Sequence, residues 1–215
     1  MEDAVGSGAG SRIGIGSQSG LGSEPESEPG SAPRSEPTRE GFGGAGTQTL
    51  VSTPANASPL AELPDCAYDN LLIIAVRDHP TKIEARLERE GHDTATVGVV
   101  PVVPAAGDYD GDLWTTDPVR PNDLTGLGMR FSDAVRHIES GTGWVLLDAL
   151  GVLLVYSEES RVCRFFQTLA NRVRAHGARG VYCIAPEAVS DGTYERFRSM
   201  CDAERDSACA STDST

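Results

Sequence analysis

Two short stretches hold residue types whose spacing could support phosphate chemistry. The continuously apolar run 144–147 ends in Asp148, as expected for a strand that is buried on both faces of a parallel sheet and carries a carboxylate at its C-terminal edge. That edge is where open α/β sheets bind ligands. The second stretch, residues 77–82, follows the first apolar strand, where a phosphate-binding loop would stand. Asp148 and this turn are therefore the candidate site.

The turn at residues 77–82 lacks the composition of a phosphate-binding loop. Such a loop has the pattern G-x-x-x-x-G-K-[ST], because glycines let backbone N–H groups converge on the phosphates while the lysine supplies charge. No glycine occurs between Gly46 and Gly91, Asp78 would repel a phosphate, and Pro80 has no N–H to donate. Lys82 is expected on a solvated helix face. The residues of this degenerate phosphate turn are Arg77, Asp78, His79, Thr81 and Lys82.

Other catalytic or metal-binding patterns are missing from the sequence. The cysteines are odd in number and never spaced as C-x-x-C, so neither a disulfide framework nor a zinc ribbon is indicated. The four histidines are scattered singly. No nucleophile elbow and no Ser-His-Asp or Cys-His arrangement is visible. We expect no metal site and no catalytic residue.

The stretch from Trp144 to Ile184 predicts a strand, a crossover helix and a second strand. Apolar residues recur at helical spacing between Val162 and Val173, and at least one of Phe165 and Phe166 should be buried against the sheet. A strand-helix-strand unit of this length closes as a right-handed parallel crossover. The sequence thus predicts an α/β fold with three layers, in which helices flank a mostly parallel sheet.

The remaining elements alternate in the same way. Strands are predicted at 70–76 and 97–103, and helices at 80–90, from Asp123 onward and at 191–200. Residues 104–121 read as a long polar connection. The segment 149–156 is either a short helix on the sheet, which a parallel sheet favours, or part of a hairpin that turns at residues 148–151.

Composition divides the chain into three parts. Residues 1–64 are rich in Gly, Ser, Pro, Glu and Thr with few large apolar side chains, so we expect a disordered acidic arm. Residues 65–202 form the predicted domain, and 203–215 a disordered polar tail.

The formal charge of −14, with Lys82 the single lysine, bears on partners and compartment. An acidic excess disfavours nucleic acid. It fits a salt-rich cytoplasm, although GC-rich coding bias would also favour Arg over Lys. The sequence shows no membrane span and no secretory signal, which predicts a cytoplasmic protein.

The order of elements resembles the KaiC-like branch of the RecA ATPase superfamily over about residues 69–202. The resemblance is carried by the strand that ends in Asp148, the piece 150–156, the helix 161–175, the entry 177–182 to the next strand, and the segment 123–128. It implies a RecA-like P-loop NTPase fold, here without the P-loop, in which Asp148 takes the Walker B position. The chain is similar to the loop-lacking RecA-like proteins of haloarchaea, for which the resemblance implies a regulatory role.

Three functions are compatible with these patterns. The favoured one is a non-catalytic regulatory or signalling module that needs no cofactor and acts through a protein partner or self-association. The second is an ATPase with a non-standard phosphate site, in which Asp148, helped by Glu158 or Asp191, holds Mg with ATP. The third is a receiver-like signalling domain, since an aspartate at a strand end fits that fold too.

Overall fold

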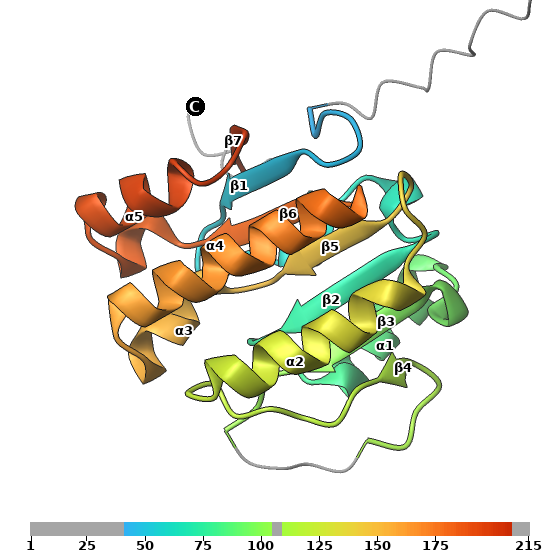
Figure 1. Cartoon of the computed structure of the whole chain (residues 1–215). Coiled ribbons are helices and arrows are strands. Elements are labelled where there is room, and N and C mark those ends of the chain that lie inside the picture. Colours follow the sequence, from blue (N-terminus) through green and yellow to red (C-terminus); the bar gives the residue numbers. More distant parts are fainter. Residues whose placement is uncertain (1–40, 105–108, 208–215) are drawn as a thin grey trace, which may run out of the picture. The chain divides into compact units, whose positions relative to one another are not determined.

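A computed structural model describes residues 41–104 and 109–207, and these residues form a seven-stranded sheet with helices on both faces (Figure 1). The elements in chain order are β1 (Gln48–Ser52), η1 (Pro59–Glu62), η2 (Asp65–Ala67), β2 (Leu71–Ala75), α1 (Pro80–Glu90), η3 (Thr94–Thr96), β3 (Val97–Pro101), β4 (Trp114–Thr115), α2 (Leu124–Ala134), η4 (Val135–His137), β5 (Trp144–Leu147), α3 (Leu150–Tyr156), α4 (Glu159–His176), β6 (Arg179–Ile184), η5 (Pro186–Ala188), α5 (Asp191–Arg198) and β7 (Ala203–Asp206). The η elements are single turns of 3-10 helix.

All strand pairs are parallel, and the strand order is β4-β3-β2-β5-β6-β1-β7. The predicted crossover is confirmed, because β5 and β6 are neighbours with Leu146 opposite Val181. On its other side β5 pairs with β2, with Leu147 opposite Ile74. The C-terminal ends of these three strands therefore lie together at one edge of the sheet.

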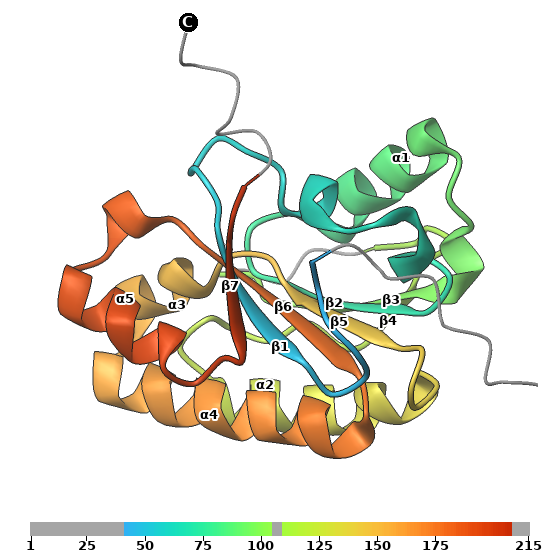
Figure 2. The same ribbon diagram turned by 90° about the horizontal axis from the view of Figure 1, so that it is seen from above.

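Alternate side chains of each strand enter two separate cores, as the period of two requires. Leu72, Val145 and Tyr182 pack under α2, α3, α4 and α5, whereas Leu71 and Val181 pack under α1, η1 and η2. Figure 2 shows the two helical layers on opposite sides of the strands. The predicted fold class, an α/β structure of three layers, is confirmed.

The helices follow the sequence pattern closely. Helix α4 ends at Gly177, whose φ of 75° suits a residue without a side chain. Helix α2 begins after Asp123, whose carboxylate accepts a hydrogen bond of 2.8 Å from the N–H of Gly126. The segment after Asp148 is the helix α3, as a parallel sheet favours, and the hairpin alternative is wrong. None of the described helices is long and apolar enough to cross a lipid bilayer.

The predicted boundary of the folded domain at residue 64 is wrong. Strand β1 lies inside the segment that we expected to be disordered, and it pairs with β6 on one side and β7 on the other. Its polar residue Gln48 is fully buried, and both ends of its side-chain amide are hydrogen-bonded. The amide oxygen accepts a hydrogen bond from the hydroxyl of Tyr182, and the amide nitrogen donates one of 2.8 Å to the carbonyl of Gly46. The first 40 residues of the predicted arm lie outside the described residues.

Two further strands were missed in segments that looked polar. Residues 203–206, expected in the tail, form the edge strand β7, whose side chains alternate between half-buried and exposed. Within the predicted connection 104–121, the two-residue strand β4 pairs with β3, and Val119 forms a bridge with Val102. Such short edge strands carry little apolar periodicity, so composition alone resembles a loop. Residues 105–108 and 208–215 lie outside the described residues.

Candidate functional site

Asp148 follows the last residue of β5, and its carboxylate points across the sheet to the turn after β2. Its oxygen Oδ1 accepts a hydrogen bond of 2.7 Å from the backbone N–H of Val76, and Oδ2 accepts bonds of 3.1 Å from Arg77 and 3.4 Å from Asp78. The parallel pairing of β2 with β5 brings these groups together. The carboxylate therefore caps the first residues of the neighbouring turn.

Burial controls the protonation of Asp148. The side chain is only 5% exposed, and burial raises its pKa from 3.8 to about 6, although the three backbone N–H groups act in the opposite direction. Since this pKa lies close to neutrality, the carboxyl group takes up a proton under mildly acidic conditions. The same N–H donors satisfy both of its oxygens when it is ionised.

The residues of the predicted degenerate phosphate turn lie between β2 and α1, and they form an ordinary helix start. His79 is the N-cap of α1, and its Nδ1 accepts a hydrogen bond of 3.4 Å from the N–H of Thr81 and lies 3.2 Å from the hydroxyl of Thr81. Pro80 occupies the first helical position, as expected from its fixed φ. The side chain of Arg77 is exposed.

Lys82 and Asp78, two of the charged residues of the turn, neutralise each other. The ammonium group of Lys82 lies 2.6 Å from the carboxylate of Asp78, as an i,i+4 pair at the start of α1. The lysine side chain is 72% exposed, which places it on the solvated helix face as predicted. The lysine thus faces a carboxylate of the turn that precedes its helix, and the turn offers a phosphate no free ammonium group.

A cleft of about 180 Å³ opens beside Asp148 at the C-terminal edge of the sheet. It is bounded by Arg77 and Asp148 on one side and otherwise by small or apolar residues and one thiol: Thr53, Ala55, Ala149, Gly151, Val152, Val155, Cys183, Ile184, Ala185 and Ala188. Burial raises the pKa of Cys183 to about 12, so this thiol keeps its proton. Glu158 and Asp191, the possible helpers of Asp148, do not line the cleft.

The cleft is small and mostly apolar. Ligand pockets for drug-sized molecules span roughly 300–1,000 Å³, so this cleft has room for a side chain more readily than for a nucleotide. Within residues 41–104 and 109–207 no group of three or more His, Cys, Asp or Glu side chains is arranged to hold a metal ion. What the arrangement offers is an apolar recess with one exposed arginine at its mouth.

Sequence reasoning found Asp148 and the turn but not the cleft beside them. Thr53 and Ala55 come from the chain just after β1, a strand that we had assigned to the arm. Val152 and Val155 come from α3, and Val155 is 78% exposed despite its apolar side chain. The signal for that wall was the continuous apolar run 152–155, which exceeds what a helix with one buried face needs.

A family model described as "Family of unknown function (DUF7504)" matches residues 46–204. The chain belongs to this family. The matched segment begins ahead of β1 and ends within β7, so it includes six complete strands and the start of the seventh, among them the strands missed from the sequence. No curated protein matches the chain.

Solved structures share the fold at low sequence identity. A KaiC-like protein, PH0186 from the hyperthermophilic archaeon Pyrococcus horikoshii OT3, is 11% identical with a TM-score of 0.53, over 75% of this chain and 73% of that protein. A second protein of the same organism, PH0250, is 10% identical with a TM-score of 0.50, over 78% and 85% of the two chains. The chain therefore has a KaiC-like RecA fold.

Proposed function

We propose that this chain is a non-catalytic KaiC-like module that regulates or signals through protein partners. One observation carries the proposal: the carboxylate of Asp148 already accepts the backbone N–H groups of Val76, Arg77 and Asp78. In a phosphate-binding loop the N–H groups of this turn face the nucleotide. Here the carboxylate of Asp148 occupies the place that a nucleotide phosphate would have.

A nucleotide phosphate would meet unfavourable electrostatics at this turn. It would have to displace a buried carboxylate from its donors, and Asp78 beside it is also acidic. Phosphoryl transfer depends on positioning and charge compensation by the loop amides, a lysine and magnesium. Within residues 77–82, Pro80 has no N–H to donate and the ammonium group of Lys82 is paired with Asp78, so the turn lacks one amide donor and a free lysine.

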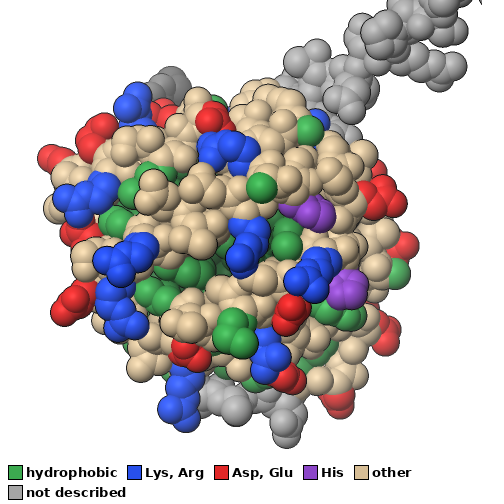
Figure 3. Space-filling view, viewed as in Figure 1, with side chains coloured by type: hydrophobic (Ala, Val, Ile, Leu, Met, Phe, Trp, Pro, Cys, Tyr) green, Lys and Arg blue, Asp and Glu red, His purple; other side chains and the backbone are tan. Residues whose placement is uncertain are grey.

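A second surface supports the role of protein partners. Figure 3 shows basic side chains, which are arginines because the single lysine lies on α1, on the face formed by α2 and α4, around a hollow in which apolar side chains are exposed. The hollow, of about 280 Å³, includes Leu124, Phe165, Arg161 and Arg164 in its lining. Neither arginine forms an ion pair with any residue in the described part of the chain. In a chain of net charge −14, such a basic and apolar hollow fits an acidic segment with an apolar anchor.

The same proposal includes that the chain comes from the haloarchaeal RecA-like proteins that lack the phosphate-binding loop. A charge of −14 with one lysine fits a protein that works in the cytoplasm of a salt-loving cell. A hydrated carboxylate surface keeps a protein dissolved there. Binding experiments on this chain therefore belong in molar KCl.

Nucleotide titration tests the proposal. The full chain is titrated with ATP and with ADP, each with magnesium, in molar KCl by calorimetry, and phosphate release is measured in parallel on the wild type and on Asp148→Asn. We expect no saturable binding at micromolar nucleotide and no turnover that differs between the two proteins. Turnover that needs magnesium and vanishes in Asp148→Asn would establish the ATPase alternative instead.

A further inference from the structure

The hollow of about 280 Å³ between α2 and α4 has two walls of different character. The wall from α4 carries Arg161 and Arg164, whereas Leu124, Thr125 and Gly128, which line the wall from α2, have no charge. No Asp or Glu is among the described residues that line the hollow. A ligand in this hollow therefore meets positive charge on one side and uncharged surface on the other.

The two arginines lie within one turn of α4 and can bind an anion together. Residues three apart on a helix have Cβ atoms about 5–6 Å apart, so the like charges of Arg161 and Arg164 repel each other. Both side chains are exposed, and neither forms an ion pair with a residue in the ranges 41–104 and 109–207. Guanidinium groups bind carboxylates through strong, often paired, hydrogen bonds. The wall from α4 thus favours two acidic side chains at a similar spacing.

Gly128 leaves an open space that the packing of α2 does not require. Glycine inside a helix is destabilising relative to alanine. At Gly126 a Cβ atom would collide with the carboxylate of Asp123, the N-cap of α2, whereas at Gly128 it would have no atom within 4 Å. The space at Gly128 is shared with the partly buried ring of Phe165 on the other wall. The hollow therefore has room for an apolar side chain of a ligand.

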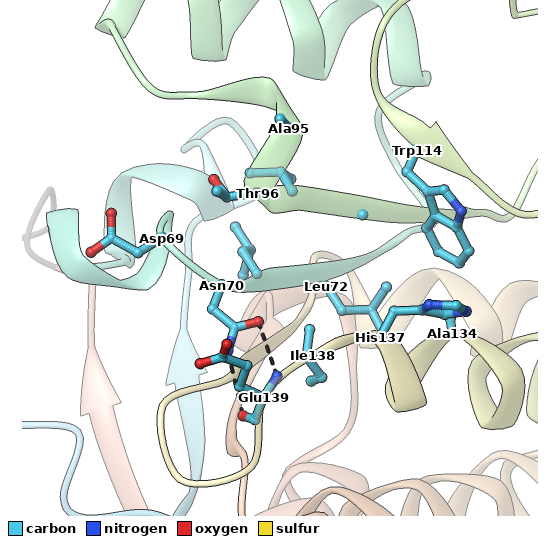
Figure 4. Close-up of a pocket in the computed structure, with 13 residues that line it drawn as sticks. Asp69, Asn70, Leu72, Ala95, Thr96, Trp114, Ala134, His137, Ile138 and Glu139 are labelled. Carbon is cyan, nitrogen blue, oxygen red and sulfur yellow. Dashed lines mark hydrogen bonds between the residues drawn. The ribbon is translucent and has the colours of Figure 1, made fainter.

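Two other cavities of the structure have acidic residues in their linings. The cavity of about 390 Å³ beside Trp114 includes Asp69 and Glu139 (Figure 4), and the cleft of about 180 Å³ includes Asp148. The hollow between α2 and α4 is the better fit for an acidic ligand. The net charge of −14 does not prevent such a ligand from approaching, because molar salt limits electrostatic repulsion to about 3 Å.

We propose that this hollow binds a segment of a partner protein in which an apolar side chain is followed by two acidic side chains on the same face. The apolar side chain lies between Gly128 and Phe165, and the two carboxylates accept hydrogen bonds from Arg161 and Arg164. Residues two apart in an extended segment share a face at a spacing of about 7 Å. A segment of the form Leu-x-Glu-x-Glu therefore matches both walls.

This inference rests on the proposed function, because it names the chemistry of the protein partner. The two can nevertheless fail separately. Nucleotide titration and phosphate release test whether the chain is catalytic, whereas peptide titration tests the hollow.

Three acetylated and amidated peptides test the apolar and the charged contacts separately. The full chain in molar KCl is titrated by calorimetry with Leu-Ser-Glu-Ser-Glu, with the uncharged Leu-Ser-Gln-Ser-Gln, and with Ser-Ser-Glu-Ser-Glu, which lacks the apolar side chain. We expect saturable binding of the first peptide and at least tenfold weaker binding of the other two. Absence of binding of the first peptide up to about 1 mM, or equal binding of either control peptide, would overturn the proposal.

Matched variants test whether the named residues form the site. Gly128→Leu fills the hollow and should abolish binding of Leu-Ser-Glu-Ser-Glu without lowering the midpoint of denaturant unfolding, because leucine favours a helix more than glycine does. Arg161→Gln and Arg164→Gln should each weaken binding roughly tenfold. Arg89→Gln removes an arginine that is 70% exposed on α1 and should bind as the wild type does. Unchanged binding in Gly128→Leu, or in both variants of the α4 arginines, would overturn the proposal.

Two further measurements test other occupants of the hollow. Sedimentation of the chain alone should show no self-association that Gly128→Leu abolishes; such self-association would mean that a second copy occupies the hollow. Inorganic phosphate should bind more weakly than Leu-Ser-Glu-Ser-Glu, because it has no apolar side chain. Equally tight binding of phosphate would assign the hollow to a phosphate group, and either of these results would overturn the proposal.

Discussion

Asp148 and Val76 are joined by a hydrogen bond of 2.7 Å between a buried side-chain carboxylate and a backbone N–H, across two adjacent strand ends. The bond links the C-terminal end of β5 to the first residue after β2. It lies at the edge at which open α/β sheets bind their ligands. The carboxylate that the sequence predicted at a Walker B position thus stabilises the turn after β2.

Replacing this carboxylate should destabilise the fold without changing its size. Asp148→Asn keeps one acceptor oxygen but turns an amide NH2 toward backbone donors at Val76, Arg77 or Asp78. An unsatisfied buried donor costs about 1–3 kcal/mol, and we expect a loss of this order in the free energy of unfolding by denaturant at neutral pH. Asp78→Asn is the control: it breaks an ion pair whose lysine side chain is 72% exposed, and it should cost less than about 1 kcal/mol. Equal losses in the two variants would contradict the cap.

Stability should also respond to pH through the same group. Because burial raises the pKa of Asp148 from 3.8 to about 6, the folded state binds more protons than the unfolded state between these values. The contribution of Asp148 is therefore fully present below the unfolded pKa and is lost as the pH rises through the folded pKa. From about pH 4 to about pH 7, the stability of the wild type relative to Asp148→Asn should fall by about 2 kcal/mol.

The comparison with Asp148→Asn isolates this effect, because the other carboxylates titrate in both proteins. Denaturant unfolding curves are collected for the two proteins across the pH range. A stability difference that stays constant with pH would show that the folded-state pKa is not raised.

The position of Asp148 could be predicted from sequence, but its partners could not. A continuous apolar run that ends in a carboxylate identifies a strand terminus. Which N–H groups that carboxylate meets depends on the pairing of β5 with β2, two strands about seventy residues apart in the chain. Side-chain periodicity describes one strand at a time and carries no record of its neighbours.

The missed strand β1 shows why composition misled us about the arm. Gln48 and Thr49 are polar but fully buried, and the glycine-rich sequence ahead of them resembles a linker. Burial of Gln48 is tolerated because of its hydrogen bond with Tyr182, a residue of β6. A cavity of about 390 Å³ that Gly98 and Trp114 help to line also could not be predicted, since it depends on the pairing of β4 with β3.

Leu50 provides a direct test that β1 belongs to the core. Its side chain is fully buried beneath the helical layer that contains α4 and α5. Leu50→Ala should lower the free energy of unfolding by about 2–5 kcal/mol, measured by denaturant titration. Val155→Ala is the matched control, because a side chain that is 78% exposed should change stability by less than about 0.5 kcal/mol. If Leu50→Ala proved as mild as the control, β1 would be a peripheral part of an arm.

The two neighbouring phenylalanines of the crossover helix α4 differ in their burial. Phe166 is fully buried and meets the rings of Tyr182 and Phe197 edge to face, with centroids 4.8 and 5.3 Å apart, whereas Phe165 is only partly buried. Phe166→Ala should cost about 3–5 kcal/mol, a large part of a typical stability of about 5–15 kcal/mol. Phe165→Ala should cost clearly less, because its side chain loses less contact.

Phe166→Leu separates the ring contacts from the filled volume. It keeps most of the apolar bulk but removes both edge-to-face contacts, and aromatic pairs contribute about 0.5–1.5 kcal/mol each beyond area burial. We therefore expect Phe166→Leu to fall between the wild type and Phe166→Ala in denaturant unfolding. A larger loss for Phe165→Ala than for Phe166→Ala would mean that α4 is rotated by about one residue, or roughly 100° about its axis, relative to the sheet.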